Sequence, residues 1–233
     1  SEDELSNISF KINKGQTLAI IGATGSGKTT LISLIPRFYD ATDGEVLVDG
    51  VNVKNYKFDT LYDKLGYVTQ KAVLFAGSIR ENVFFGESAA PETDEELKNA
   101  IELSQAEEFV DKLPDGTEHM ISQMGRNVSG GQKQRLSIAR ALSRKPEILV
   151  FDDSFSALDY KTDAKLREGL NEKLKDTTKI IVAQRISTIR HADKIIVLDR
   201  GEAVGMGTHE ELMKNCDVYK EIALSQLSAA ELA

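Results

Sequence analysis

The sequence predicts an α/β fold: a mainly parallel sheet with antiparallel edge strands, covered by helices and extended by a helical insert. Short apolar runs, typical of buried strands, occupy residues 17–21, 148–151, 178–182 and 194–198. Helical patterns at 161–174 and 208–226 alternate with these runs, and such alternation is typical of a parallel sheet. From residue 78 to about residue 142 the pattern is mainly helical, so we expect residues 72–145 to form a separate helical lobe.

The first elements are predicted from local patterns. Residues 8–12 alternate between apolar and polar side chains, which indicates a strand. A glycine-rich stretch follows the apolar run 17–21, and residues 28–35 then have a helical pattern. Residues 45–53 alternate around the dipeptide Asp49-Gly50, which is typical of a β-hairpin.

The division of the chain follows from the next elements. Residues 65–69 form another strand pattern, which ends at Gln70. The helical insert comes after it, with polar breaks at 86–93 and 114–128. We therefore expect residues 1–233 to form a single domain. Its core lobe would comprise residues 1–71 and 146–233, and its helical lobe residues 72–145.

Composition excludes several classes of protein. The 233 residues are 41% hydrophobic and 28% charged, which is ordinary for a globular domain. The net charge is −8 and no Lys/Arg-rich stripe interrupts it, so we expect no nucleic-acid partner. No run reaches the roughly 18 apolar residues of a membrane span. The single cysteine, Cys216, excludes an internal disulfide, and we interpret it as a small apolar filler in a helix.

A phosphate-binding loop lies between the first apolar run and the first helix. Residues 22–29 read GATGSGKT, a full match to G-x-x-x-x-G-K-[ST]. Glycines there let backbone N–H groups face a phosphate, and the helix start adds its positive dipole end. Lys28 is expected to neutralise the β- and γ-phosphates of ATP. The expected nucleotide-binding residues of this loop are Gly22, Thr24, Gly25, Ser26, Gly27, Lys28, Thr29 and Thr30.

The metal-binding half of this site is predicted from a second strand. The apolar run 148–151 ends at Asp152, and in P-loop folds an aspartate at that position holds Mg²⁺. The Thr29 hydroxyl is the other expected protein ligand. The sequence therefore predicts a P-loop NTPase core that binds ATP and Mg²⁺.

A second anion-binding helix start lies between these two motifs. Residues 129–132 read SGGQ, in which Ser129 can cap a helix while Gly130 and Gly131 expose N–H groups; Gln132 completes the motif. With this motif the chain resembles the ATPase domain of an ABC transporter of the exporter type. The resemblance covers nearly the whole chain and implies that SGGQ binds the γ-phosphate of the ATP held by a second such domain.

The resemblance extends to three further positions. Gln70 matches the loop that senses the metal and the membrane domain, and it is implied as a metal-site and catalytic residue. Asp159 ends the stretch SALD, which resembles the loop that crosses the dimer interface, and it is implied as a nucleotide-binding residue. Gln123 stands where exporters usually have a glutamate in the loop before the signature. That loop's role is therefore carried over only in part.

Two departures fall on expected catalytic positions. The family's general base is a glutamate directly after the strand-end aspartate, and this chain has Asp153 there. The shorter side chain withdraws the carboxylate by roughly 1.5 Å, and a misplacement of about 1 Å can cost about 10²-fold in rate. Gln184 stands where the family has a switch histidine; it can donate a hydrogen bond but cannot be cationic. His119, His191 and His209 are expected to be surface or capping residues.

An aromatic side chain that stacks on adenine is the last expected absence. The family places it in a short strand upstream of the P-loop, and neither Phe10 nor Tyr39 stands at that place. Loss of ring stacking would weaken ATP binding by roughly 1–3 kcal/mol. We expect the chain to be part of a longer protein, with the N-terminal strand and the membrane domain outside the sequence.

The resemblance predicts a weakly hydrolysing motor domain of an ABC exporter at the cytoplasmic face of the cell membrane. Its partners would be a transmembrane domain and a second, non-identical ATPase domain, as in a heterodimeric bacterial multidrug exporter. An essentially non-hydrolysing regulatory subunit and an importer ATPase remain alternatives. ABC-type DNA-repair or chromosome ATPases carry long heptad-patterned insertions, for which the motif spacing leaves no room.

Overall fold

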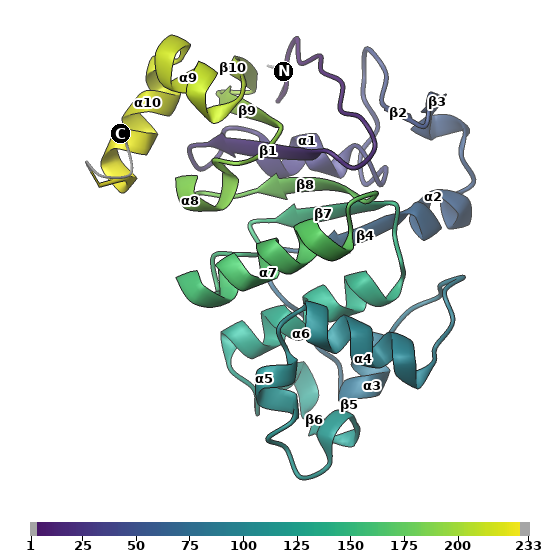
Figure 1. The fold of residues 1–233 in the computed structure, drawn as a ribbon. Helices are drawn as coiled ribbons and strands as arrows, with labels where there is room; N and C mark the ends of the chain where they lie inside the picture. The colour runs from purple at the N-terminus through teal and green to yellow at the C-terminus, as the bar shows by residue number, and fades with distance from the viewer. Residues whose placement is uncertain (1–3, 229–233) are drawn as a thin grey trace.

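A six-stranded sheet forms the centre of the computed structural model, which describes residues 4–228 (Figure 1). Its strand order is β10-β9-β1-β8-β7-β4. All neighbours are parallel except β9 and β10, which pair antiparallel at one edge. The strands are β1 Thr17–Gly22, β4 Leu65–Val68, β7 Ile148–Asp152, β8 Thr178–Val182, β9 Lys194–Asp199 and β10 Glu202–Gly207. The predicted α/β fold with an antiparallel edge is confirmed.

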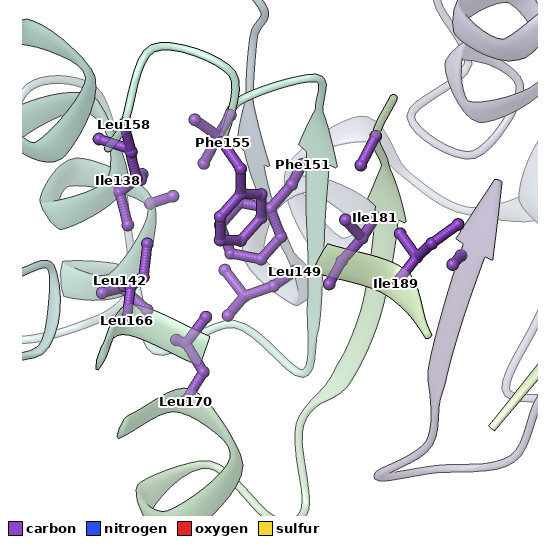
Figure 2. Close-up of a cluster of buried hydrophobic side chains, with 14 of the residues drawn as sticks. Ile138, Leu142, Leu149, Phe151, Phe155, Leu158, Leu166, Leu170, Ile181 and Ile189 are labelled. Atoms are coloured by element: carbon purple, nitrogen blue, oxygen red, sulfur yellow. The ribbon is translucent and has the colours of Figure 1, made fainter. Parts of the chain in front are cut away.

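Both faces of the sheet are covered, as the unbroken apolar strands require. Leu18 and Ile20 of β1 point to the face covered by helix α1 (Lys28–Ser33), while Ala19 and Ile21 belong to the core on the opposite face. Helices α6 (Gly130–Ser143), α7 (Tyr160–Lys173) and α8 (Ile186–Ile189) contribute to that second core. Figure 2 shows its centre, where Phe151 and Phe155 lie together, with ring centroids 5.0 Å apart.

The predicted insert is mainly helical. It contains α3 (Ile79–Val83), α4 (Asp94–Leu103), α5 (Glu107–Val110) and α6, and these helices gather beside edge strand β4 in Figure 1. The remaining elements are the short strand pair β5 (Gly77–Ser78) and β6 (Met120–Ile121) and the 3₁₀ turns η2 (Gly116–Glu118) and η3 (Gln123–Gly125). One hydrophobic cluster runs from this insert to the sheet. The boundary of the helical lobe at 72–145 therefore stays a prediction.

The predicted hairpin at 45–53 is present but short. Strands β2 (Leu47–Val48) and β3 (Val51–Asn52) pair antiparallel. Asp49 and Gly50 between them both have positive φ, 52° and 74°. Positive φ at both central residues is the requirement of a type I′ turn. The 3₁₀ turn η1 (Val53–Asn55) and helix α2 (Phe58–Lys64) then lead into β4.

Three sequence-based predictions were wrong: the strand at residues 8–12, the end of the first helix, and the unbroken C-terminal helix. Residues 8–12 form no strand, although Ile8 and Ile12 pack against the core on the α1 face. Alternation alone does not make a strand when no neighbouring strand pairs with the segment. Helix α1 ends at Ser33, before residue 35, and continues only as i→i−3 turns.

The C-terminal helical stretch is also interrupted. It consists of α9 (His209–Asn215) and α10 (Asp217–Gln226), and Cys216 between them has extended φ and ψ of −129° and 103°. Cys216 is therefore buried at a helix junction and not within a helix. None of the helices found in residues 4–228 is long and apolar enough to cross a membrane.

Candidate functional site

The glycine-rich loop emerges from the carboxyl end of central strand β1. A Cβ added at Gly22 would lie 2.3 Å from the Leu198 carbonyl oxygen and 2.6 Å from the Ser26 hydroxyl. Gly25 and Gly27 have φ of 78° and 102°, in the left-handed region that favours glycine. The loop therefore requires glycine at these three positions for its own shape, before any ligand is considered.

Lys28 curls back over this loop. Its Nζ donates to the carbonyl oxygens of Gly22 at 2.7 Å and Ala23 at 2.9 Å. Burial lowers the pKa of the Lys28 ammonium, while the nearby carboxylates of Asp153 and Asp152 act in the opposite direction. The ammonium thus lies at the mouth of the loop. There it can exchange its hydrogen bonds to carbonyl oxygens for hydrogen bonds to a phosphate.

The other loop residues differ in what they contact. Ser26 is buried, and its carbonyl oxygen accepts a hydrogen bond from the Gly201 N–H at 3.0 Å. Thr24 is exposed at the tip of the loop. Thr30, on the first turn of α1, donates its hydroxyl hydrogen bond to the Glu4 carboxylate. The residues of the loop were predicted as a set, and their contacts with a nucleotide remain a prediction.

Thr29 and Asp152 converge from two elements. The Thr29 Oγ1 donates to both carboxylate oxygens of Asp152, at 3.2 and 3.3 Å. Asp152 ends β7 and is only 6% exposed. Burial raises the pKa of Asp152, and the hydrogen bond from Thr29 and the charge of Lys28 oppose this effect.

This donor set fits Mg²⁺. A hydroxyl and a carboxylate oxygen are hard ligands, which Mg²⁺ prefers. Within residues 4–228 no group of three or more His, Cys, Asp or Glu residues could hold a metal by itself. Mg²⁺ is usually bound through one or two protein ligands plus substrate phosphates and water, and Thr29 and Asp152 would supply the protein ligands. Bound there, Mg²⁺ would neutralise phosphate charge.

Three expected catalytic residues meet at one carboxylate. The Asp153 Oδ2 accepts hydrogen bonds from the Nε2 atoms of Gln70, at 3.2 Å, and of Gln184, at 3.4 Å. Asp153 follows β7 directly, and Gln70 and Gln184 lie two residues beyond the ends of β4 and β8. Burial and then the charge of Asp152 raise the pKa of Asp153, and the charges of Lys28 and Arg185 and the bond from Gln70 oppose this.

The backbone conformation at Asp153 fixes the position of its carboxylate. Asp153 has a φ of 49°, and its N–H donates to the Val182 carbonyl oxygen at 2.9 Å, which continues the pairing of β7 with β8. The side-chain hydrogen bond of Gln70 goes to Asp153, not to Thr29 or Asp152. The expected role of Gln70 as a metal ligand therefore stays a prediction.

The signature helix start has the expected local structure. Ser129 and Gln132 form a reciprocal capping box: the Gln132 N–H donates to the Ser129 hydroxyl at 3.2 Å, and the Ser129 N–H to the Gln132 Oε1 at 3.0 Å. A Cβ at Gly130 would meet nothing within 4 Å in the chain. A Cβ at Gly131 would lie 3.3 Å from the Ala157 carbonyl oxygen. The chain's own packing therefore does not explain glycine at position 130.

Asp159 is engaged within its own chain. It is the N-cap of α7, where its carboxylate accepts from the Thr162 N–H at 2.9 Å and from the Thr162 hydroxyl at 2.7 Å. These hydrogen bonds lower the pKa of Asp159. A nucleotide contact by Asp159 would have to come in addition to this cap.

Two residues next to the site were missed by sequence reasoning. The Arg185 guanidinium donates to the carbonyl oxygens of Leu158 at 3.0 Å and Ser156 at 3.1 Å. Gln226, 40 residues beyond Ile186, hydrogen-bonds the backbone of the same loop. These hydrogen bonds of Arg185 go to backbone atoms, which no residue pattern marks. Gln226 ends an ordinary amphipathic helix.

The histidines lie outside this cluster. His209 begins α9 and its Nδ1 lies 2.7 Å from the hydroxyl of Tyr219, which is fully buried. Burial lowers the pKa of His209. It therefore packs the C-terminal helices together and is more than a surface residue. The aromatic residues Phe10 and Tyr39, neither of which was expected to stack on adenine, are 37% and 66% exposed.

The fold and the clustered residues define an ATP-binding domain of the P-loop class. A phosphate loop, a threonine–aspartate pair and a second helix start occur together on a parallel sheet covered on both faces. Residues 5–156 match the family model described as ABC transporter. The chain therefore belongs to the ABC transporter family.

Individual relatives agree with this assignment. The chain is 47% identical over 229 residues, 97% of its length, to an "Uncharacterized ABC transporter ATP-binding protein" of Mycobacterium tuberculosis. It is 42% identical over 221 residues, 95% of its length, to the "Putative multidrug export ATP-binding/permease protein YgaD" of Bacillus subtilis. The chain spans 39% and 38% of these two proteins.

A solved structure shows the same fold. It is that of a bacterial Atm1-family ABC exporter with ATP bound, to which the chain is 35% identical, with a TM-score of 0.90. The match covers 95% of this chain and 39% of the exporter chain. The resemblance to exporter ATP-binding domains that the motifs predicted is confirmed.

Proposed function

We propose that this chain is the ATP-binding motor domain of an ABC exporter and pairs head-to-tail with a second such domain. The observation that carries the proposal is the open signature helix start. Gly130 is exposed, and a Cβ added to it would meet nothing within 4 Å on its own chain, so a phosphate from outside has room to approach this helix start. The chain's own phosphate loop would in turn be completed by the partner's signature.

We further propose that the chain's own site hydrolyses ATP poorly. The carboxylate of Asp153 is held by two amides, and neither Gln70 nor Gln184 can relay a proton at neutral pH. Asp153 is also one methylene shorter than the glutamate expected there, so a general base would act from too far away. The raised pKa of Asp153 makes the carboxylate a better proton acceptor, but it does not bring that carboxylate closer to the attacking water.

The partner ATPase would then be non-identical. Its own site would carry a glutamate and a histidine where this chain has Asp153 and Gln184. The intact Ser129–Gln132 signature of this chain would complete that competent site. The names of the relatives, which include multidrug export proteins, favour an exporter over an importer.

A membrane domain is the second proposed partner, at the cytoplasmic face of the cell membrane. A hollow of about 280 Å³ lies beside Thr69, the neighbour of Gln70, and is lined in part by Val73, Phe85 and Arg140. Val73 and Phe85 are 49% and 50% exposed. A segment of the membrane domain seated in this hollow, against Val73 and Phe85, would reach the backbone next to Gln70 and so the Asp153 cluster.

The division of labour is tested with variants assayed side by side in the assembled transporter. Ser129→Trp or Gly130→Asp should abolish ATP hydrolysis, because each blocks the signature that completes the partner's site. Asp153→Asn should leave most of the activity, because little chemistry occurs at that site. Ser225→Trp on the exposed side of α10 is the control for added bulk. Loss of turnover in Asp153→Asn, with retention in the signature variants, would reverse the assignment.

A further inference from the structure

The last residue of the C-terminal helix is joined to the loop that follows β8. Gln226 ends α10, and its Oε1 accepts a hydrogen bond from the Ile186 N–H at 2.8 Å. Its Nε2 donates to the Gln184 carbonyl oxygen at 2.7 Å. One side-chain amide thus pairs with the backbone on both sides of Arg185, in the manner of a neighbouring strand.

These two hydrogen bonds satisfy backbone groups that the sheet leaves free. β8 ends at Val182, and Ala183 still donates to the Ile20 carbonyl oxygen at 3.3 Å. Helix α8 then begins at Ile186, and its N-cap residue, Arg185, makes no side-chain cap. Because the first N–H groups of a helix need an acceptor, the amide of Gln226 caps α8 from a different helix.

The loop held in this way carries two side chains toward the site. Gln184 donates to the Asp153 carboxylate at 3.4 Å. Arg185 points its guanidinium at the segment after Asp153, where it donates to the Ser156 and Leu158 carbonyl oxygens. It also lies over the Tyr160 ring, 4.7 Å from the centroid. A shift of the loop backbone would therefore move both contacts together.

We propose that Gln226 is a positioning residue for the nucleotide site. By fixing the backbone at Gln184 and Ile186, it sets where Gln184 meets Asp153 and where Arg185 holds the 156–158 segment. The end of the C-terminal helix is thereby linked to the catalytic carboxylate. The inference rests on the proposed function, because it takes Asp153 and Gln184 as members of the ATP site.

The two helices have anchors of their own. Tyr219, Ala223 and Leu227 hold α10 in the core, with exposures of 0%, 0% and 9%. The Thr188 hydroxyl of α8 donates to the buried Asp163 carboxylate at 2.8 Å. Removing the Gln226 amide should therefore loosen the loop while both helices stay packed.

Hydrogen exchange of the nucleotide-free chain tests this directly. Gln226→Met keeps the length of the side chain but has no amide, and Ser225→Ala on the same helix is the control. The Ile186 amide should exchange about tenfold faster in Gln226→Met, the range expected when a backbone hydrogen bond is lost. The amides of Val182 and Ala223 should be unchanged. Equal exchange at Ile186 in variant and parent, or an equal rise at all three amides, would overturn the proposal.

A conservative variant separates the two hydrogen bonds. Gln226→Glu keeps an acceptor for the Ile186 N–H but cannot donate to the Gln184 carbonyl oxygen at neutral pH. The Ile186 amide should then stay within about threefold of its parental rate. Exchange as fast as in Gln226→Met would show that the amide does not act through these contacts.

Turnover supplies a readout that a purely structural role would not move. In a chain carrying Asp153→Glu and Gln184→His, adding Gln226→Met should lower kcat about tenfold and leave KM for ATP within about twofold. A matched rise in KM, or an unchanged kcat, would count against positioning. The hydrogen-exchange experiment needs no nucleotide. It therefore tests the proposal even if the variant with Asp153→Glu and Gln184→His still hydrolyses ATP slowly. That slowness would count against the proposed function alone.

Discussion

Gly130 allows stability and activity to be separated by a single methyl group. The residue is the first of α6, has free space for a Cβ, and lies in the signature that we propose to face the partner's ATP. We expect Gly130→Ala to leave the isolated chain at least as stable as the parent while it disables the assembled transporter. A residue needed only for folding would give the opposite pattern.

The magnitudes follow from the local structure. Gly130 is helical and has no positive φ, so alanine removes only the conformational freedom of the unfolded chain. The gain is at most about 1 kcal/mol, which corresponds to a rise in Tm of roughly 1–4 °C for a domain of this size. A methyl group between the helix start and a phosphate should cost activity about as much as a lost oxyanion donor, about 10²–10³-fold.

Thermal unfolding of the chain and phosphate release by the assembled transporter measure the two effects. Glu210→Ala, at an exposed position in the first turn of α9, is the matched control for an alanine at a helix start. Gly131→Ala is less suitable because its Cβ would press on the Ala157 carbonyl oxygen at 3.3 Å. A Gly130→Ala transporter with more than half of its parental ATPase activity would refute the reasoning. So would a loss of Tm that parallels the loss of activity.

Three further variants test the chain's own site. Lys28→Ala removes the ammonium from the loop and should weaken Mg-ATP binding at least about tenfold; equal affinity by calorimetry would refute the phosphate site. The parent should turn over ATP far below about 10 s⁻¹, and Asp153→Glu combined with Gln184→His should raise the rate at concentrations where the chain dimerises, as phosphate release would show. Gly22→Ala places a Cβ 2.3 Å from the Leu198 carbonyl oxygen and should cost about 1–3 kcal/mol; an unchanged urea midpoint would contradict the close approach.

The parts of the fold that the sequence predicted are those in which neighbouring residues decide the structure. The apolar runs predicted the parallel strands, and the Asp49-Gly50 turn predicted the hairpin. The glycine loop was predictable because the positive φ of Gly25 and Gly27 requires glycine at fixed spacing. In each case the deciding residues lie within ten positions of one another.

The errors arose where contacts between residues far apart in the sequence decide the local structure. The alternation at residues 8–12 indicated a strand, but only a neighbouring strand could have made it one. The helical pattern at 208–226 continued through Cys216, where the chain turns so that α10 can bury Tyr219 against the core. Gln226 could not be assigned from its surroundings in the sequence, because both of its backbone partners lie 40 or more residues earlier.

The two departures at the catalytic positions are coupled by the structure. Gln184 and Gln70 both donate to one oxygen of Asp153, at 3.4 and 3.2 Å. A glutamate at 153 would extend into the space where these amides now meet, and a histidine at 184 would present a ring nitrogen to the same carboxylate. Residues in one hydrogen-bonded cluster change activity non-additively. Either substitution alone should therefore recover less than half of the free-energy gain of the pair, as single and double variants compared by phosphate release would show.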